Sequence, residues 1–312
     1  MLIALIVVGV LFVLWVLLNL KTSRPDATLI PRIHPYRTMM FHIMPTRNES
    51  VVYFDTVVDA EKLLAYLEAT KAKFHCDVTH CLVAACMFGM KHNPSMNRFT
   101  KGERIYQRKG TWISFSMKRQ KLNKAAKLVA VKMEARDEEN FEQLCARING
   151  SIKEERSDKV TSADKEYNLL TSLPRPLLKL GVRLFRWMDY YNILPGSFIR
   201  FDPMYCSIFI ANLGSVGMAP GYHHLYEWGT ASLFMMVGRI EERAVVKDGQ
   251  IVIQKCLPIR FTYDERADDG LTAGHGINSA VRVLEDPFTY LGCVKGDGTD
   301  AKPILADVQA AA

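Results

Sequence analysis

The chain has 312 residues, of which 49% are apolar and 23% are charged. This composition predicts a packed globular core and excludes a largely disordered chain. The 40 Lys and Arg exceed the 33 Asp and Glu by seven, a mild surplus that suits an anionic membrane face or an anionic cofactor. The sequence has no Lys- or Arg-rich run and no basic stripe interleaved with aromatic residues, so we expect no nucleic-acid partner.

The chain has seven cysteines, an odd number, and no two of them are spaced as CxxC. Several lie inside apolar runs, as Cys81 and Cys86 do, where a buried small side chain is the expected role. This usage indicates a reducing compartment, and it favours neither a disulfide framework nor a cysteine zinc site.

Residues 1–20 are predicted to form a transmembrane anchor. Residues 2–18 contain neither a charge nor a proline, and about 20 apolar residues of α-helix cross a hydrocarbon core of about 30 Å. The alternative is a cleaved signal peptide, but the basic start and the small-residue cleavage site of such a peptide are both missing. The charges that follow the helix predict a single-pass protein with its C-terminal domain in the cytoplasm: Lys21, Arg24, Arg32 and Arg37.

The rest of the chain is divided by its composition into a linker, a domain and a tail. Residues 21–37 contain three prolines, which prevent the anchor helix from continuing, and they are expected to be a linker. One domain is predicted over residues 38–294. Residues 295–312 are expected to be a loose tail.

Strand and helix patterns alternate along the predicted domain. Residues 51–60 are β-branched and aromatic, as in a strand, and Asp59 is expected to cap a helix over residues 61–74. A second helix starts near Thr79 and is apolar nearly all round, so it should be buried.

Strands and one further helix are expected after this buried helix. The apolar alternation from Trp112 to Met117 predicts a half-buried strand, and another strand is expected over residues 127–135. Residues 137–153 form an amphipathic pattern, followed by a polar connection over residues 153–168. This order predicts an α/β domain, and the lack of a Gly-rich phosphate loop excludes a nucleotide-binding Rossmann unit.

Residues 205–292 contain a series of short motifs in a fixed order. These are Asn212-Leu213-Gly214, Val237-Gly238, Asp248-Gly249, Asp264-x-Arg266-x-x-Asp269-Gly270 and Leu284-Glu285-Asp286-Pro287, with Pro94-Ser95-Met96-Asn97 upstream. In this order and spacing, residues 30–290 resemble the catalytic domain of dihydrolipoamide acyltransferases, which form the cores of 2-oxo acid dehydrogenase complexes, and are similar to chloramphenicol acetyltransferase. The resemblance implies a chloramphenicol-acetyltransferase-like two-layer domain with a mixed sheet. It also implies a homotrimer with active sites in channels between subunits, and CoA or acyl-CoA as the ligand.

Two groups of the family chemistry are replaced in this sequence. The family histidine, which takes the proton of the acceptor, falls on Glu265, and the serine that hydrogen-bonds the tetrahedral oxyanion falls on Ala211. A methyl group donates no hydrogen bond, and loss of one such donor typically slows a reaction by about 10²–10³-fold. Loss of the general base costs about 10²–10⁴-fold, so the family reaction should be nearly abolished.

Five side chains near these motifs are candidates for a role in catalysis or in the fold. Glu265 is either a substitute base or a carboxylate in an ion-pair network with Arg266. His223 and His224 lie in the loop after Asn212-Leu213-Gly214 and act either as a base or in loop packing, and we expect no metal site there. Asp269 is a candidate catalytic residue at a motif position, although the resemblance implies a mainly structural role for it. His275 is either a substitute base or a histidine on the surface of a helix.

A second basic segment follows the polar connection. Lys179, Arg183 and Arg186 fall on one stripe of a predicted helix that is otherwise rich in Leu, Phe and Trp. Such a helix either lies in a membrane interface, where it contacts lipid or a membrane protein, or packs on the domain's own sheet.

The sequence leaves three functions open. The first is a catalytically degenerate acyltransferase that acts as a scaffold or partner-binding protein on the cytoplasmic membrane face. The second is a CoA-dependent acyltransferase with altered catalytic residues and a lipophilic or membrane-bound acceptor. A non-catalytic sensor of acyl-CoA is the third.

Overall fold

The computed structural model describes residues 1–118, 128–156 and 172–306, so most of the expected polar connection lies outside the described residues. The elements of the first part are α1 (Leu2–Leu20), β1 (Ala27–Leu29), α2 (Pro35–Ile43), β2 (Val51–Asp59), α3 (Glu61–Thr70), α4 (Val78–His92), η1 (Pro94–Asn97), β3 (Arg98–Lys101), β4 (Arg104–Arg108) and β5 (Trp112–Lys118). They are followed by β6 (Leu128–Glu134), α5 (Phe141–Arg156), α7 (Arg175–Tyr190), α8 (Gly196–Phe201), β7 (Ile208–Asn212), η2 (Leu213–Val216), β8 (Leu233–Val237), β9 (Glu241–Lys247), β10 (Gln250–Asp264), α9 (Gly270–Glu285) and α10 (Pro287–Tyr290). The alternation of helices and strands is the predicted α/β pattern.

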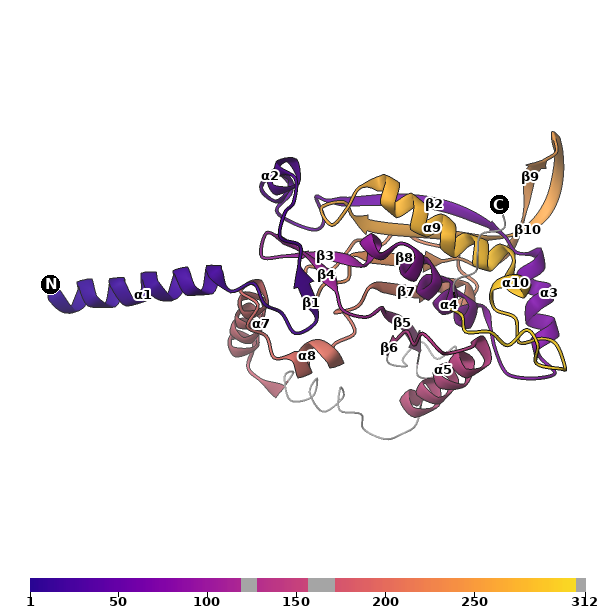
Figure 1. Cartoon of the computed structure of the whole chain (residues 1–312), viewed down its shortest axis with the longest axis horizontal. Coiled ribbons are helices and arrows are strands. Elements are labelled where there is room, and N and C mark those ends of the chain that lie inside the picture. Colours follow the sequence, from indigo (N-terminus) through magenta and orange to yellow (C-terminus); the bar gives the residue numbers. More distant parts are fainter. Residues whose placement is uncertain (119–127, 157–171, 307–312) are drawn as a thin grey trace.

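The main sheet of the described residues has seven strands. Six of them run in the order β2-β10-β8-β7-β5-β6, and β9 pairs with β10. β7 is parallel to both of its neighbours, β5 and β8, whereas the other pairs are antiparallel, so the sheet is mixed as predicted. A smaller sheet in the order β1-β4-β3 lies at the end of the domain nearest α1 (Figure 1).

Helices cover one face of the main sheet (Figure 1). Ile210 of β7, Met235 of β8 and Phe261 of β10 belong to the largest core cluster, together with buried side chains of α4, α5 and α9. α4 is buried over most of its length because nearly all of its side chains are apolar, as the sequence predicts. The opposite face has a smaller cluster that includes Phe209, Phe234 and Leu225 of the loop between β7 and β8.

The predicted half-buried alternation of β5 is wrong in the first half of the strand. Ile113, Ser114 and Phe115 are all buried, because β5 lies inside the sheet between β6 and β7 and both of its faces are covered there. Ser114 is accommodated because its hydroxyl donates to the carbonyl of Pro203 over 2.8 Å.

The segment predicted as a linker, residues 21–37, is part of the folded domain. β1 pairs with β4, and the side chain of Arg24 is only 1% exposed. Arg24 donates to the carboxylates of Asp26 and Asp189, both over 3.0 Å. The sequence does not reveal this because Asp189 is 165 positions away.

The expected loose tail is also wrong for residues 295–306. Ile304 and Leu305 are buried in the main core, and the Ile304 amide donates to the carbonyl of Glu139 over 3.0 Å. Asp300 accepts hydrogen bonds from the amides of Val294 and Lys295, which closes the preceding turn. The domain therefore extends beyond the predicted range at both ends, and residues 307–312 lie outside the described residues.

The Asp248-Gly249 motif forms the turn of a hairpin between β9 and β10. Asp248 and Gly249 have φ values of 51° and 77°, so both lie in the left-handed region that a two-residue hairpin turn needs. This hairpin projects from the domain at the end opposite to α1 (Figure 1). The N-terminal α1 is the one helix of the described chain that is long and apolar enough to cross a membrane.

α4 and α9 cross closely at two glycines. A Cβ atom on Gly89 would lie 2.9 Å from the carbonyl oxygen of Gly276, and a Cβ atom on Gly276 would lie 1.5 Å from Sδ of Met96. α4 approaches α9 this closely because Gly89 has no side chain, and the missing side chain of Gly276 makes room for Met96 of η1.

Replacing Gly276 with alanine is expected to lower the free energy of unfolding by about 1–3 kcal/mol, because the added methyl group would overlap the buried side chain of Met96. Gly274→Ala in the same helix is the matched control, since a Cβ atom there meets nothing within 4 Å. The control should leave stability unchanged or raise it by up to about 1 kcal/mol. Urea unfolding of both variants in one detergent measures the difference, and equal losses would contradict the packing argument.

Candidate functional site

The motif at the end of β10 is organised around the buried carboxylate of Asp264. Its two oxygens accept hydrogen bonds from the hydroxyls of Ser50 and Thr100, over 3.0 and 3.2 Å. Arg266 binds the same carboxylate with two guanidinium nitrogens, both at 2.9 Å. Arg266 also donates to the carbonyls of Met44 and Pro45, so this pair joins the end of β10 to the segment before β2.

The charge of Asp264 is maintained in spite of its burial. Burial by itself raises the pKa of this carboxyl, but the hydrogen bonds and the charge of Arg266 outweigh it, with help from Arg47 and Ser50. The net result is a pKa below the usual value. Asp264 and Arg266 are therefore a fixed structural ion pair, and neither is available as a proton carrier.

Glu265 lies between these two residues but does not join their network. Its backbone amide donates to the carbonyl of Ser50 over 3.0 Å, and its side chain is partly exposed. The interpretation of Glu265 as the partner of Arg266 is wrong, because Arg266 is committed to Asp264. Within the described residues the carboxylate of Glu265 has no hydrogen bond or ion pair.

The last two carboxylates of the motif stabilise the start of α9. Asp269 is the N-cap residue and accepts from the amide of Thr272 over 2.9 Å, which lowers the pKa of its exposed carboxyl. Asp268 binds Arg37 and Arg98, at 3.0 and 2.6 Å. Asp269 therefore has the structural role that the resemblance implies.

The motif at the end of β7 holds its position by close backbone packing. Asn212 accepts from the amide of Ser215 over 3.1 Å and donates to the hydroxyl of Thr79 over 3.1 Å. A Cβ atom on Gly214 would lie 2.3 Å from the carbonyl oxygen of Gly238, and a Cβ atom on Gly238 would lie 2.3 Å from Cδ of Pro220, so neither position has room for a side chain. Ala211 precedes this turn and presents only a methyl group.

Ala211 and Glu265 lie at opposite ends of the sheet within one chain. Ala211 is in register with Met236 of β8, which in turn is in register with Arg260 of β10. Glu265 follows β10 five residues after Arg260, which corresponds to about 16 Å along a strand. A single chain therefore cannot bring these two positions to one reacting atom.

The two loop histidines lie over the face of the sheet that carries the smaller cluster. His223 stacks on Phe234 with ring centroids 4.2 Å apart, and its carbonyl accepts from the hydroxyl of Thr262 over 2.6 Å. Burial lowers the pKa of His223, so its imidazole is neutral at neutral pH. His224 is exposed, and its Nδ1 lies 2.9 Å from the carbonyl of Leu225.

These contacts place His223 in loop packing and do not bring it together with the motif residues. His223 lies over Thr262, which is three residues before Glu265 and therefore about 10 Å from it along the strand. His275 lies on the exposed surface of α9, as expected. Among the described residues there is no cluster of three His, Cys, Asp or Glu side chains that could hold a metal ion.

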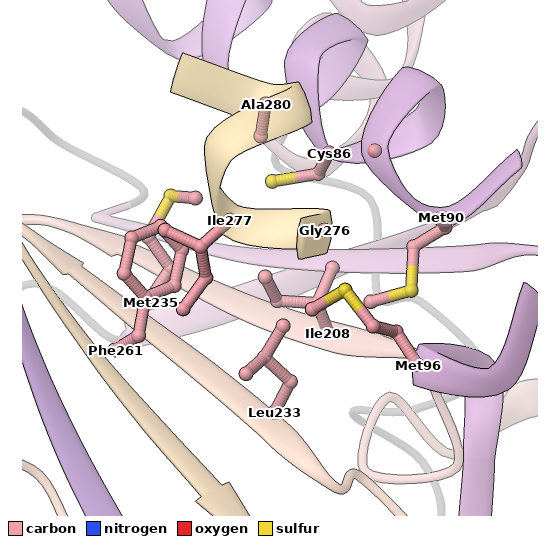
Figure 2. Close-up of a pocket in the computed structure, with 11 residues that line it drawn as sticks. Cys86, Met90, Met96, Ile208, Leu233, Met235, Phe261, Gly276, Ile277 and Ala280 are labelled. Atoms are coloured by element: carbon pink, nitrogen blue, oxygen red, sulfur yellow. The ribbon is translucent and has the colours of Figure 1, made fainter. Parts of the chain in front are cut away.

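Neither of two further cavities contains these residues. One is an apolar void of about 10 Å³ between the sheet and helices α4 and α9 (Figure 2). Its lining includes Cys86, Met96 and Phe261, and it is too small for a substrate. The other is an open depression of about 310 Å³ between α3 and the β9–β10 hairpin, lined by residues such as Glu61 and Lys255.

Some residues that fix this region were not found from the sequence. Arg47 is buried and donates to the carbonyls of Tyr226, Gly229 and Ala231, which hold the end of the histidine loop. Ser50 and Thr100 are likewise distant in the chain from Asp264. No local pattern marks them, and only the pairing of β10 with β2, in which Asp264 is opposite Val51, brings Ser50 close.

Comparison with known proteins shows that the chain is similar to one group of acyltransferases. Residues 204–291 match the family model of the 2-oxoacid dehydrogenases acyltransferase (catalytic domain). The described domain also has the fold of a probable dihydrolipoamide acetyltransferase from Listeria monocytogenes 4b F2365, with a TM-score of 0.55, 16% identity and coverage of 83% of this chain and 94% of that one. The cubic core of the pyruvate dehydrogenase multienzyme complex is similar, with a TM-score of 0.53, 17% identity and coverage of 84% and 98%.

The sequence relatives agree with the fold. The dihydrolipoyllysine-residue acetyltransferase component of the pyruvate dehydrogenase complex of Bacillus subtilis (strain 168) is 36% identical over 140 residues, which is 42% of this chain and 30% of that protein. The corresponding Staphylococcus aureus (strain Mu50) protein is 32% identical over 85 residues, 26% of this chain and 19% of that protein. The chain thus spans less than a third of the length of these relatives. Residues 204–291 are thus similar to the acyltransferase catalytic domain of the 2-oxoacid dehydrogenases, and the domain that contains them has the same fold as these acyltransferases.

Proposed function

We propose that this protein is a membrane-anchored member of the acyltransferase fold that has lost the family reaction and serves as a scaffold or partner-binding protein. The observation that carries the proposal is the joint replacement at Ala211 and Glu265. A serine, a histidine and an asparagine were investigated in the catalytic mechanism of the Azotobacter vinelandii dihydrolipoamide acetyltransferase, whose structure has a TM-score of 0.53 to this chain. Here a methyl group and a carboxylate stand at the serine and histidine positions.

The intact framework around these positions supports a retained, non-catalytic role. Asp264, Arg266, Asp269 and the motif glycines all make the contacts that hold the fold, whereas the two chemically active positions have changed. Loss of the reaction without loss of the fold leaves a surface to which other molecules bind. A protein partner in the membrane fits this role, because α1 would hold the domain beside it.

The anchor and its orientation rest on α1 and the charges that follow it. Arg24 and Arg37 are used in ion pairs of the folded domain, with Asp26 and Asp268. Orientation is decided during insertion, before the domain folds, so these charges still favour the cytoplasmic side. These charges support the proposal that the domain lies at the cytoplasmic membrane face.

Assembly into a trimer would bring Ala211 of one copy near Glu265 of another, which a single chain cannot do. The β9–β10 hairpin offers a contact surface, since Val246, Ile251 and Ile253 are 73%, 77% and 68% exposed. Burial of such side chains against a second copy stabilises an assembly by about 1.5–3 kcal/mol for each one that is fully covered.

We expect the full chain in detergent to sediment as three copies, and Ile251→Glu to shift it toward one copy. Gln250→Glu is the matched control, because it adds the same charge to the same hairpin without removing apolar surface. Analytical ultracentrifugation with density matching of the detergent measures the protein mass. A wild-type protein that is monomeric at micromolar concentration would contradict the trimer.

A second candidate is a CoA-dependent acyltransferase with altered residues that acts on a lipophilic or membrane-bound acceptor. The unpaired carboxylate of Glu265 favours it, since a carboxylate without a partner is free to accept a proton. CoA or acyl-CoA would be the acyl donor. The acyl-transfer measurement described in the Discussion separates the two candidates.

A further inference from the structure

α7 is attached to the domain mainly at its C-terminal end. Asp189, near this end, is buried and binds Arg24 at 3.0 Å and Lys101 at 2.6 Å. The adjacent Asn192 donates to the carbonyl of Lys21, just after α1, over 3.0 Å. The helix is therefore fixed directly beside the point where the apolar α1 ends (Figure 1).

The rest of α7 leaves a wide apolar surface uncovered. Leu177, Leu180, Leu184 and Trp187 are 52%, 62%, 52% and 44% exposed. Their spacing of three, four and three residues places them on one face of the helix. This face is distinct from the side that turns toward the domain, where Phe185 and Met188 pack against the cluster of Leu194 and Ile199. The interpretation of α7 as a helix packed on the main sheet is therefore wrong.

A stripe of positive charge borders the exposed apolar face. It consists of four exposed residues, Arg175, Lys179, Arg183 and Arg186. Within the described part of the chain none of the four has an ion-pair or hydrogen-bond partner. The one acidic residue of the helix, Asp189, is neutralised by Arg24 and Lys101, so the outer surface of α7 carries positive charge alone.

We propose that α7 lies in the membrane interface, with its apolar face among the lipid chains and its basic stripe on anionic headgroups. The inference rests on the proposed membrane anchor, because α1 determines which side of the domain faces the bilayer. A helix with one apolar face that contains Trp and an adjoining basic stripe is the pattern of an interfacial helix. Asn192, just after α7, contacts Lys21, just after α1. α7 therefore lies at the depth at which α1 leaves the hydrocarbon core of the membrane.

A second copy of the chain fits this surface less well than lipid. Two copies of α7 facing each other would bring eight cations together without a counter-charge, because all four of each helix are unpaired. An anionic leaflet supplies the opposite charge. The β9–β10 hairpin, which is the proposed contact between copies, lies at the other end of the domain (Figure 1).

Hydrogen exchange of the full chain in proteoliposomes tests the inference. The protein is reconstituted into phosphatidylcholine alone or into phosphatidylcholine with roughly one-third phosphatidylglycerol, and exchange is followed separately for peptides of α1 and α7. We expect the α7 amides to exchange about tenfold or more slowly in the anionic vesicles, since each of several cations adds attraction to the surface. Slow hydrogen exchange of the α1 amides in both lipids would indicate that α1 is inserted in the membrane.

Substitutions on α7 and a matched substitution on the distant hairpin complete the design. Leu180→Glu with Leu184→Glu, or Lys179→Glu with Arg183→Glu, should abolish the lipid-dependent protection of α7. Lys255→Glu makes the same kind of charge reversal on the β9–β10 hairpin and should leave the protection of α7 unchanged. Equal exchange of α7 in both lipids, with α1 protected, would overturn the inference and leave the anchor standing. Protection of α7 that follows protein concentration and not lipid charge would assign the surface to a second copy, and unprotected α1 would overturn the anchor itself.

Discussion

Replacing Asp264 with alanine is expected to lower the free energy of unfolding by about 3–5 kcal/mol. The substitution leaves the buried Arg266 without its counter-charge, and the hydroxyl of Thr100 loses its acceptor. An uncompensated charge in the interior costs far more than the contact itself contributes. Denaturant unfolding in one detergent measures the effect.

The double variant Asp264→Leu with Arg266→Met tests whether the loss of stability comes from the uncompensated charge or from the changed shape of the site. Removal of both charges leaves no uncompensated ion, so the double variant should lose less stability than Asp264→Ala alone. A double variant that is as unstable as the single one would show that shape, and not charge pairing, decides the cost.

The contribution of Asp264 to the free energy of unfolding also depends on pH. Its pKa in the folded protein is held below the usual value, so the stabilisation is fully present above the unfolded carboxyl pKa of about 3.9. It is lost as the pH falls through the lower folded pKa, because protonation discharges the carboxylate. The stability difference between the wild type and Asp264→Ala should therefore be constant above about pH 5 and narrow below about pH 4. A difference that widens on acidification would contradict the assignment.

Local motifs predicted the parts of the fold that depend on nearby residues. The turn at Asp248-Gly249 needs two left-handed residues, and its sequence marks it. α4 is buried because its side chains are apolar nearly all round, and the helix after Asp269 starts where a cap is available. Each of these features is decided within a few positions of the chain.

The features that the sequence did not reveal depend on distant contacts. The Pro-rich stretch after α1 reads as a linker, because the partner of Arg24 is on α7. In the sequence Arg266 is next to Glu265 and is expected to pair with it, but in the structure the turn directs its guanidinium group to the carboxylate of Asp264. Ala211 and Glu265 appear as one site when the motifs are aligned, whereas strand register separates them within one chain.

Acyl transfer by the purified full chain is expected to be at least about 10²-fold slower than transfer by an active relative. Loss of the oxyanion donor at Ala211 accounts for about 10²–10³ and loss of the imidazole base at Glu265 for about 10²–10⁴. The two effects need not multiply, because they act on one transition state. A carboxylate that is partly exposed to water lacks the driving force for proton transfer that an imidazole has near neutral pH.

The most direct measurement is the rate of acetyl transfer from acetyl-CoA to dihydrolipoamide, followed by CoA release. The wild type, Glu265→Ala and the Bacillus subtilis acetyltransferase are assayed side by side in the same detergent. We expect the wild type and Glu265→Ala both to remain at the uncatalysed background, while the bacterial enzyme turns over. Transfer by the wild type within about 10²-fold of the bacterial enzyme would contradict this expectation, and a fall of that rate in Glu265→Ala would establish the carboxylate as the working base.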